Sequence, residues 1–231
     1  MEILHVMPAW FLSTNILFEL LFFIFAAAIA FYSLRIYRIT RQRESRIFGL
    51  AFLSIALSRL ALFLVNAFFL TLTKGGLRVL EFEDIMSIKD IAVTAYVSLF
   101  IIGLITLVYL SLKIKNPKYY LLLILLSAIA LVSGLNKSFL IYSLAFIFLV
   151  IISFNYINEF LKTKNKNTFL VALGFILLAI SSLLLVIVAD YLMPRVYVAA
   201  YLLEVLGYVS IFSSLISILK NGKKTKSARS H

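Results

Sequence analysis

The chain has 231 residues, of which 63% are hydrophobic and only 14% are charged, and its mean hydropathy is +1.07. A soluble domain is typically about half apolar and a quarter charged, so this composition excludes a soluble fold and predicts one integral membrane domain. The formal net charge is +12, but the basic residues lie mostly at the ends of apolar runs, where the positive-inside rule accounts for them; we expect no nucleic-acid partner. Cysteine is absent, which excludes disulfides, Cys-ligated metals and thiol catalysis.

The chain begins with a segment that lacks the basic region of a secretory signal peptide. Residues 1–13 contain no Lys or Arg, and the apolar run that follows, about Thr14 to Tyr37, is long enough to cross a bilayer. Five arginines, from Arg35 to Arg46, lie at the end of this run and directly after it. We therefore expect residues 1–13 to be an extracytoplasmic segment and the first run to be a retained span.

Six further apolar runs of helical length follow the first. They are about Ile47–Thr73, Ile88 or Asp90 to Lys113, Tyr119–Gly134, Ser138–Leu161, Thr168–Met193 and Tyr197–Leu219. The fourth span of the seven is the shortest and barely matches a hydrocarbon layer of about 30 Å. The longest connection, Lys74 to Lys89, is the acidic one, with Glu81, Glu83 and Asp84.

The charge of the connections predicts the topology. The connections after the first, third and fifth spans are basic, as is the tail of residues 221–231, whereas the others are neutral, mildly charged or acidic. Because short cytoplasmic loops carry the excess of Lys and Arg, the N-terminus is predicted outside and the C-terminus in the cytoplasm. The fold class is thus all-α: a seven-transmembrane-helix bundle over residues 14–220, multi-pass in the cell membrane.

The last span carries a polar face inside the membrane. Tyr197, Tyr201, Glu204 and Tyr208 recur at helical spacing, so they lie along one side of one helix. Glu204 lies about 13 Å below the outer end of its span, and Arg59 about 18 Å above the inner end of the second span. Both then lie near one level, where pairing reduces the cost of burying each charge, and the sequence predicts an Arg59–Glu204 ion pair.

These residues predict a polar interior in the outer half of the bundle. We expect an outward-facing cavity, covered by the acidic Glu81–Asp84 loop, that takes a small polar or cationic ligand or a proton. The candidate ligand-binding residues are Arg59, Asn66, Tyr197, Tyr201, Glu204 and Tyr208. The alternative is that Arg59 and Glu204 form only a structural clamp.

Other polar residues within the spans have simpler predicted roles. Glu19 and Asp190 lie nearer the outer surface, and we expect their side chains to reach the interface. Asn66 and several serines are expected to form hydrogen bonds between helices. The serines are Ser54, Ser58, Ser181, Ser182 and Ser213.

The sequence contains no constellation typical of a cofactor, a metal or a catalytic centre. The only histidines, His5 and His231, lie at the termini and cannot ligate haem within the membrane. The last span has no lysine before Lys220, so it cannot form a retinal Schiff base in mid-membrane. We expect no cofactor, no metal and no enzymatic activity.

The layout of seven spans with an outside N-terminus is similar to the input regions joined to bacterial and archaeal sensor kinases. This resemblance implies a receptor-like or sensor-like binding module that signals through a cytoplasmic partner. Two alternatives stay open: a small solute or proton-coupled transporter, and an accessory subunit bound to another membrane protein.

Overall fold

A computed structural model describes the backbone of residues 9–75, 82–114, 116–133, 137–190 and 193–227, and these residues form seven helices. In chain order they are α2 (Ala9–Thr40), α3 (Arg43–Gly75), α4 (Phe82–Ser111), α5 (Pro117–Ser133), α6 (Lys137–Thr163), α7 (Lys166–Asp190) and α8 (Pro194–Ser227). All but α5 contain a stretch long and apolar enough to cross a membrane. The prediction of an all-α bundle is confirmed, and six of the seven described helices are compatible with the predicted membrane spans, whereas α5 is a shorter apolar helix. The orientation in the membrane stays a prediction.

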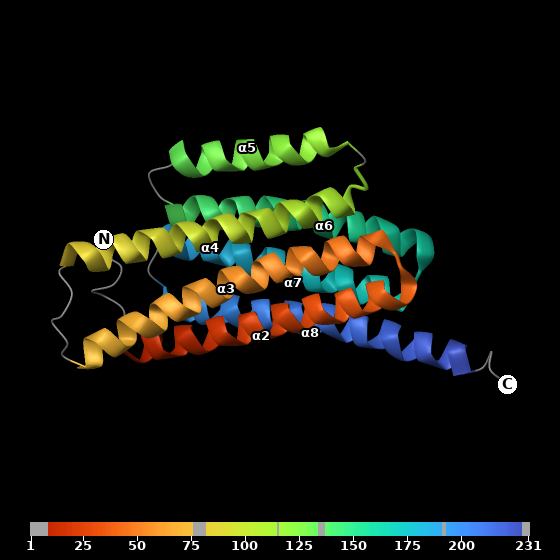
Figure 1. The fold of residues 1–231 in the computed structure, drawn as a ribbon, viewed down its shortest axis with the longest axis horizontal. Helices are drawn as coiled ribbons and strands as arrows, with labels where there is room; N and C mark the ends of the chain where they lie inside the picture. Colours follow the sequence, from red (N-terminus) through yellow and green to blue (C-terminus); the bar gives the residue numbers. More distant parts are fainter. Residues whose placement is uncertain (1–8, 76–81, 115, 134–136, 191–192, 228–231) are drawn as a thin grey trace.

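Six helices form a closed ring that follows the order of the chain. α2 packs on α3, α3 on α4, α4 on α6, α6 on α7, α7 on α8, and α8 returns to α2. In the described part of the chain, α5 contacts only α4 and α6, and it lies outside the ring (Figure 1). The ring has a central axis, and the polar residues described below lie along it.

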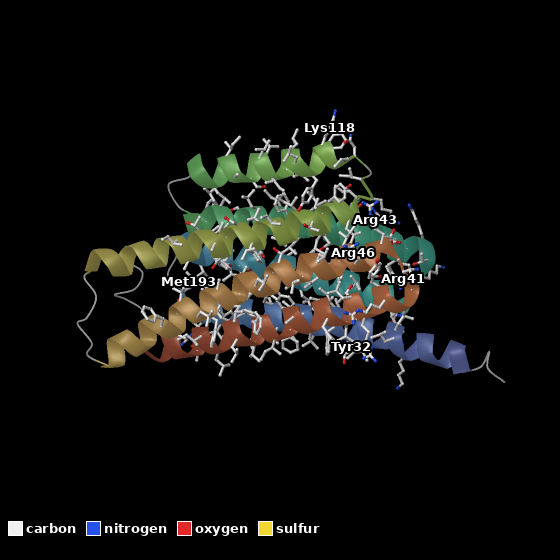
Figure 2. All side chains as sticks on the ribbon, in the orientation of Figure 1. Tyr32, Arg41, Arg43, Arg46, Lys118 and Met193 are labelled. Atoms are coloured by element: carbon white, nitrogen blue, oxygen red, sulfur yellow. The ribbon has the colours of Figure 1, made fainter. Side chains whose placement is uncertain are left out.

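Several basic residues gather at one end of the bundle. Arg41, Arg43, Arg46 and Lys118 lie at one end, here called the basic end, and Met193 lies toward the opposite end (Figure 2). The basic end is the one that the positive-inside rule assigns to the cytoplasm.

Tight connections close the helices at the basic end. Arg41, Lys113 and Lys164 adopt a left-handed backbone, with φ of 57°, 52° and 50°. Arg41 and Lys164 directly follow α2 and α6, and Lys113 lies two residues after the end of α4. A left-handed residue at this position lets its amide donate back to a carbonyl of the last turn, as Lys164 N does to Phe160 O at 2.7 Å. The Asn165 side chain then accepts from the Asn167 amide at 3.0 Å and caps the next helix, α7.

Serine hydroxyls connect neighbouring helices, as expected for Ser54 and Ser181. Ser54 Oγ donates to Leu99 O at 2.7 Å, which joins α3 to α4, and Ser181 Oγ donates to Ala200 O at 2.8 Å, which joins α7 to α8. The prediction is wrong for Ser58, whose hydroxyl donates to Ile55 O within its own helix. Ser213 likewise bonds within α8, to Val209 O. In a bilayer such serine–carbonyl bonds supplement van der Waals packing, which drives helix association.

Small residues bring α7 and α8 into close backbone contact. A Cβ placed on Gly174 would lie 2.5 Å from Ile211 Cγ1 and 2.8 Å from the Gly207 carbonyl oxygen. A Cβ on Gly207 would in turn lie 2.9 Å from the Gly174 carbonyl. Only glycine fits on either side, and the two helices approach as closely as their backbones allow.

One predicted boundary is corrected. The connection predicted from Lys74 to Lys89 is shorter, because α4 begins at Phe82 and so includes Glu83 and Asp84. The last candidate span ends at Lys220, as expected, and the backbone continues as helix to Ser227. Glu81 and the side chains of Glu83, Asp84 and Asp190 lie outside the described residues, so the proposed cover of an outward cavity stays a prediction.

Candidate functional site: a buried charge cluster on the bundle axis

Three charged side chains from α2, α3 and α8 meet inside the ring. Arg59 Nη2 forms a short ion pair with Glu204 Oε1, as the sequence predicted. Arg59 Nη1 lies 3.4 Å from Glu19 Oε2 and 3.5 Å from Glu19 Oε1. We call Glu19, Arg59 and Glu204 the triad; their exposed fractions are 1%, 5% and 5%.

The position of Glu19 corrects a prediction. Glu19 was expected to reach the outer interface, but its carboxylate is buried against Arg59. The reason is that α2 begins at Ala9 rather than near Thr14, which places Glu19 ten residues into the helix. Glu204 is also ten residues from the start of its helix, so the two carboxylates reach the same depth, about 15 Å.

Aromatic rings surround the Arg59 guanidinium. Its central carbon lies 4.9 Å from the Phe22 ring centroid, 5.3 Å from that of Phe100 and 5.9 Å from that of Tyr96. A cation over a ring face is attracted by the ring quadrupole, and the attraction is strongest where water is excluded. The rings of α2 and α4 thus stabilise the buried cation without neutralising it.

A chain of tyrosine hydroxyls leads from the triad toward the opposite end. The Tyr201 side chain lies beside the Glu19 carboxylate, and its hydroxyl forms a short hydrogen bond with the Tyr197 hydroxyl. The Tyr197 hydroxyl donates to Asn15 Oδ1 at 3.5 Å. Asn15 is half-buried and its neighbour Thr14 is exposed, so the chain ends near the surface.

A small cavity adjoins the triad on its other side. Its volume is about 30 Å³, and Arg59, Tyr142, Ser182, Glu204 and Tyr208 are among the residues that line it. Arg59 Nε is buried and has no hydrogen-bond partner within the protein. The cavity has room for about one water molecule, which would satisfy this donor.

Aromatic side chains separate this cavity from the basic end. Phe52 and Phe175 line the small cavity, whereas Phe48 and Tyr156 line the next cavity along the axis. Ring centroids lie 4.8 Å apart for Phe48–Phe52 and 5.3 Å apart for Tyr156–Phe175. We call these four residues the aromatic layer.

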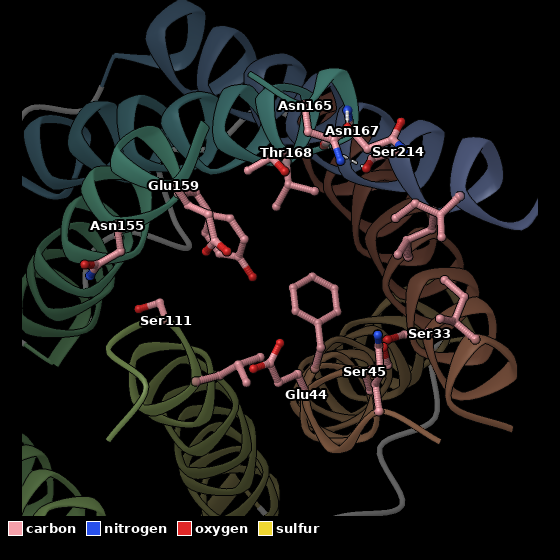
Figure 3. Close-up of a pocket in the computed structure, with 18 of the residues that line it drawn as sticks. Ser33, Glu44, Ser45, Ser111, Asn155, Glu159, Asn165, Asn167, Thr168 and Ser214 are labelled. Atoms are coloured by element: carbon pink, nitrogen blue, oxygen red, sulfur yellow. Dashed lines mark hydrogen bonds between the residues drawn. The ribbon is translucent and has the colours of Figure 1, made fainter. Parts of the chain in front are cut away.

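A larger polar cavity opens at the basic end. Its volume is about 270 Å³, and all six ring helices contribute residues to it (Figure 3). Glu44 and Glu159 point into the opening, and Glu159 Oε1 lies 3.4 Å from Lys113 Nζ. The remaining polar lining consists of hydroxyls and amides. These are Ser33, Gln42, Ser45, Ser111, Asn155, Asn165, Asn167, Thr168 and Ser214.

No known protein family matches the chain, and no curated protein or solved structure matches it. Similarity therefore assigns no activity, and a function has to be argued from the geometry of the axis.

The structure brings together five of the six candidate ligand-binding residues. Arg59 and Glu204 form the centre, Tyr201 and Tyr208 adjoin it, and Tyr197 extends it. Asn66 is half-buried on α3, seven residues beyond Arg59 and so about 10 Å farther along the axis.

The polar cavity at the basic end was missed from the sequence. Each of its residues lies near the end of a span, where a polar side chain is ordinary at a membrane interface. The available signal was the number of uncharged amides there, Asn155, Asn165 and Asn167, among connections otherwise rich in Lys and Arg.

Proposed function

We propose that this chain is a seven-helix sensor-type module of the cell membrane, without enzymatic activity, in which a small charged stimulus acts on the triad. The observation that carries the proposal is the triad itself, because it joins α2, α3 and α8 through buried charges. A change in the charge of any member alters the electrostatic balance that holds these helices together. The triad is therefore the element through which a change of charge would act on these helices.

The size of the inner cavity supports sensing over solute transport. About 30 Å³ beside the triad admits a water molecule but no organic solute, and the aromatic layer closes the axis below it. A species that binds at this depth therefore changes the packing of the helices and does not cross the bundle. The predicted ligand is accordingly restricted to a very small polar or cationic species.

The cavity at the basic end is the proposed site from which the signal passes to a cytoplasmic partner. Because every ring helix contributes to its lining, a shift of α2, α3 or α8 changes its width. With the N-terminus outside, this cavity faces the cytoplasm, where a partner protein binds and responds to its width. The basic residues around it favour a partner with an acidic surface.

A distance measurement across this cavity tests the proposal. Since the chain has no native cysteine, Gln42→Cys and Asn165→Cys can be spin-labelled specifically on opposite sides of the opening. Glu204→Gln, which removes one charge of the triad, is expected to shift the measured distance distribution. Lys118→Gln, which removes an exposed charge on α5, is the control and should leave it unchanged. An identical distribution in all three proteins contradicts the proposal.

The second candidate is a proton-coupled carrier. The observation that favours it is that polar residues approach the triad from both ends, with only the aromatic layer between them. Liposomes containing the purified protein and an internal pH-sensitive dye distinguish the two functions. A carrier gives proton flux that Glu204→Gln abolishes, whereas a sensor gives no flux above that of empty liposomes.

A further inference from the structure

The triad contains two carboxylates and one guanidinium. With every member ionised, its charge would be −1 among side chains that are almost fully buried. The other titratable groups that face it in the described part of the chain are tyrosines, and no second cation is among them. They are Tyr96 on α4, Tyr142 on α6, and Tyr197, Tyr201 and Tyr208 on α8. An unbalanced buried charge is costly, so the cluster needs one further positive charge.

We propose that the triad is a proton-binding site in which Glu19 holds one exchangeable proton. This inference rests on the proposed function and names its stimulus. Glu204 is the carboxylate that forms the short ion pair with Arg59, so it is the one stabilised as an anion. Glu19 makes only longer contacts to Arg59, of 3.4 Å and 3.5 Å, and it also lies beside the Tyr201 hydroxyl. A proton on Glu19 would turn that hydroxyl into a hydrogen-bond acceptor.

The geometry favours a proton over a sodium ion as the balancing charge. Both Glu19 oxygens face Arg59 Nη1, so a metal cation bound to them would lie against the guanidinium. A proton sits on one oxygen and needs no coordination shell. The neighbouring cavity is also lined largely by apolar side chains, which supply few of the oxygens that a hard cation requires.

The proton has a path to one end only. Hydroxyls can donate and accept at once, so Tyr201 and Tyr197 can pass a proton between Glu19 and the surface near Asn15. Toward the basic end, the aromatic layer interrupts such a path, because three of its four members are phenylalanines, which have no hydrogen-bonding atom. The fourth, Tyr156, lines the cavity at the basic end. The net reaction transfers one proton from solvent to a Glu19 carboxylate oxygen. Each tyrosine hydroxyl of the path receives one proton and releases its own, so both tyrosines end unchanged. Glu19 thus reports the acidity on the side that we predict to be outside.

Infrared difference spectroscopy of the protein in lipid nanodiscs tests the assignment. At neutral pH the wild-type protein is expected to show a protonated-carboxyl C=O band that shifts on transfer to D₂O and is lost at alkaline pH. Glu19→Gln should abolish this band, whereas Glu159→Gln, at the exposed ion pair of the basic end, should leave it intact. Tyr201→Phe should retain the band but slow its D₂O shift severalfold.

Several outcomes would overturn the proposal. No band in the wild-type protein would do so, as would a band that persists in Glu19→Gln. A band that appears only when sodium is replaced by choline would show that sodium supplies the charge. If Glu19→Gln does not fold, two measurements on folded proteins test the proposal instead. They are the loss of the wild-type band at alkaline pH and the slower D₂O shift of the band in Tyr201→Phe.

The spin-label distances separate this inference from the proposed function. A Glu19-dependent band with a cavity distance that does not respond to pH leaves the proton site standing and refutes the sensor. A distance that responds to Glu204→Gln in a protein without the band leaves the sensor standing and refutes the proton site.

Discussion

Replacing Arg59 with Met should destabilise the folded protein by about 3–5 kcal/mol, the usual cost of removing one partner from a buried ion pair. The structure places this substitution at the upper part of that range. Both carboxylates stay buried when the guanidinium is removed, at 1% and 5% exposure, and the attraction to three aromatic rings is lost with it.

Reversible unfolding in mixed detergent–dodecyl sulfate micelles, followed by circular dichroism, measures this free energy. The matched control is Lys113→Met, which breaks the Lys113–Glu159 ion pair. That pair has the same 3.4 Å length as Arg59–Glu19, but its side chains are 65% and 44% exposed. Solvent screening limits that loss to about 0–1 kcal/mol. The triple variant Arg59→Met, Glu19→Gln, Glu204→Gln should be more stable than Arg59→Met alone, because it leaves no unpaired buried carboxylate. Equal losses for Arg59→Met and Lys113→Met would refute the reasoning.

Three further predictions follow from packing and topology. Gly174→Ala should lower the free energy of unfolding by about 1–3 kcal/mol, because its Cβ would overpack against the neighbouring backbone. Gly49→Ala should lower it less, because its Cβ would meet mainly a flexible side chain. The same unfolding assay compares the two variants. Phe52→Ala should open the aromatic layer. A thiol reagent added at the basic end should then label Cys introduced by Ser182→Cys faster in the Phe52→Ala protein than in the protein with Phe52. Equal labelling rates would show that the layer is no barrier. Asn165→Cys should react with an impermeant thiol reagent only in inside-out vesicles, and reaction in intact cells would contradict the predicted orientation.

The spans and one ion pair could be predicted from the sequence because both depend on distance along a helix. Long apolar runs fix where helices cross a bilayer, and a rise of about 1.5 Å per residue puts Arg59 and Glu204 at one level. The same arithmetic failed for Glu19 because it depends on where the helix begins. The first helix begins five residues earlier than the apolar run suggested, and that shift moves the carboxylate from the interface to the axis.

The ring and its polar opening could not be predicted, because they depend on which helices are neighbours. In a membrane protein, helix surfaces that face lipid and those that face another helix are both apolar, so the sequence does not distinguish them. The short length of α5 marked it as unusual, but nothing in its sequence placed it outside the ring. Asn155 and Glu44 likewise gave no sign that they would face one opening from different helices.

α8 continues without a break from Glu204 of the triad to Ser227, so a small tilt at Glu204 moves the far end of the helix by a larger distance. From Glu204 to Ser227 the helix runs 23 residues, or about 35 Å, and its last turns extend beyond Lys220 as a rod of basic sequence. A tilt of about 5° at Glu204 would displace the far tip by about 3 Å, a distance comparable with a hydrogen bond. Under the proposed function, a single charge gained or lost at the triad would thereby displace the basic end of α8 by a distance large enough to change its contact with an acidic surface.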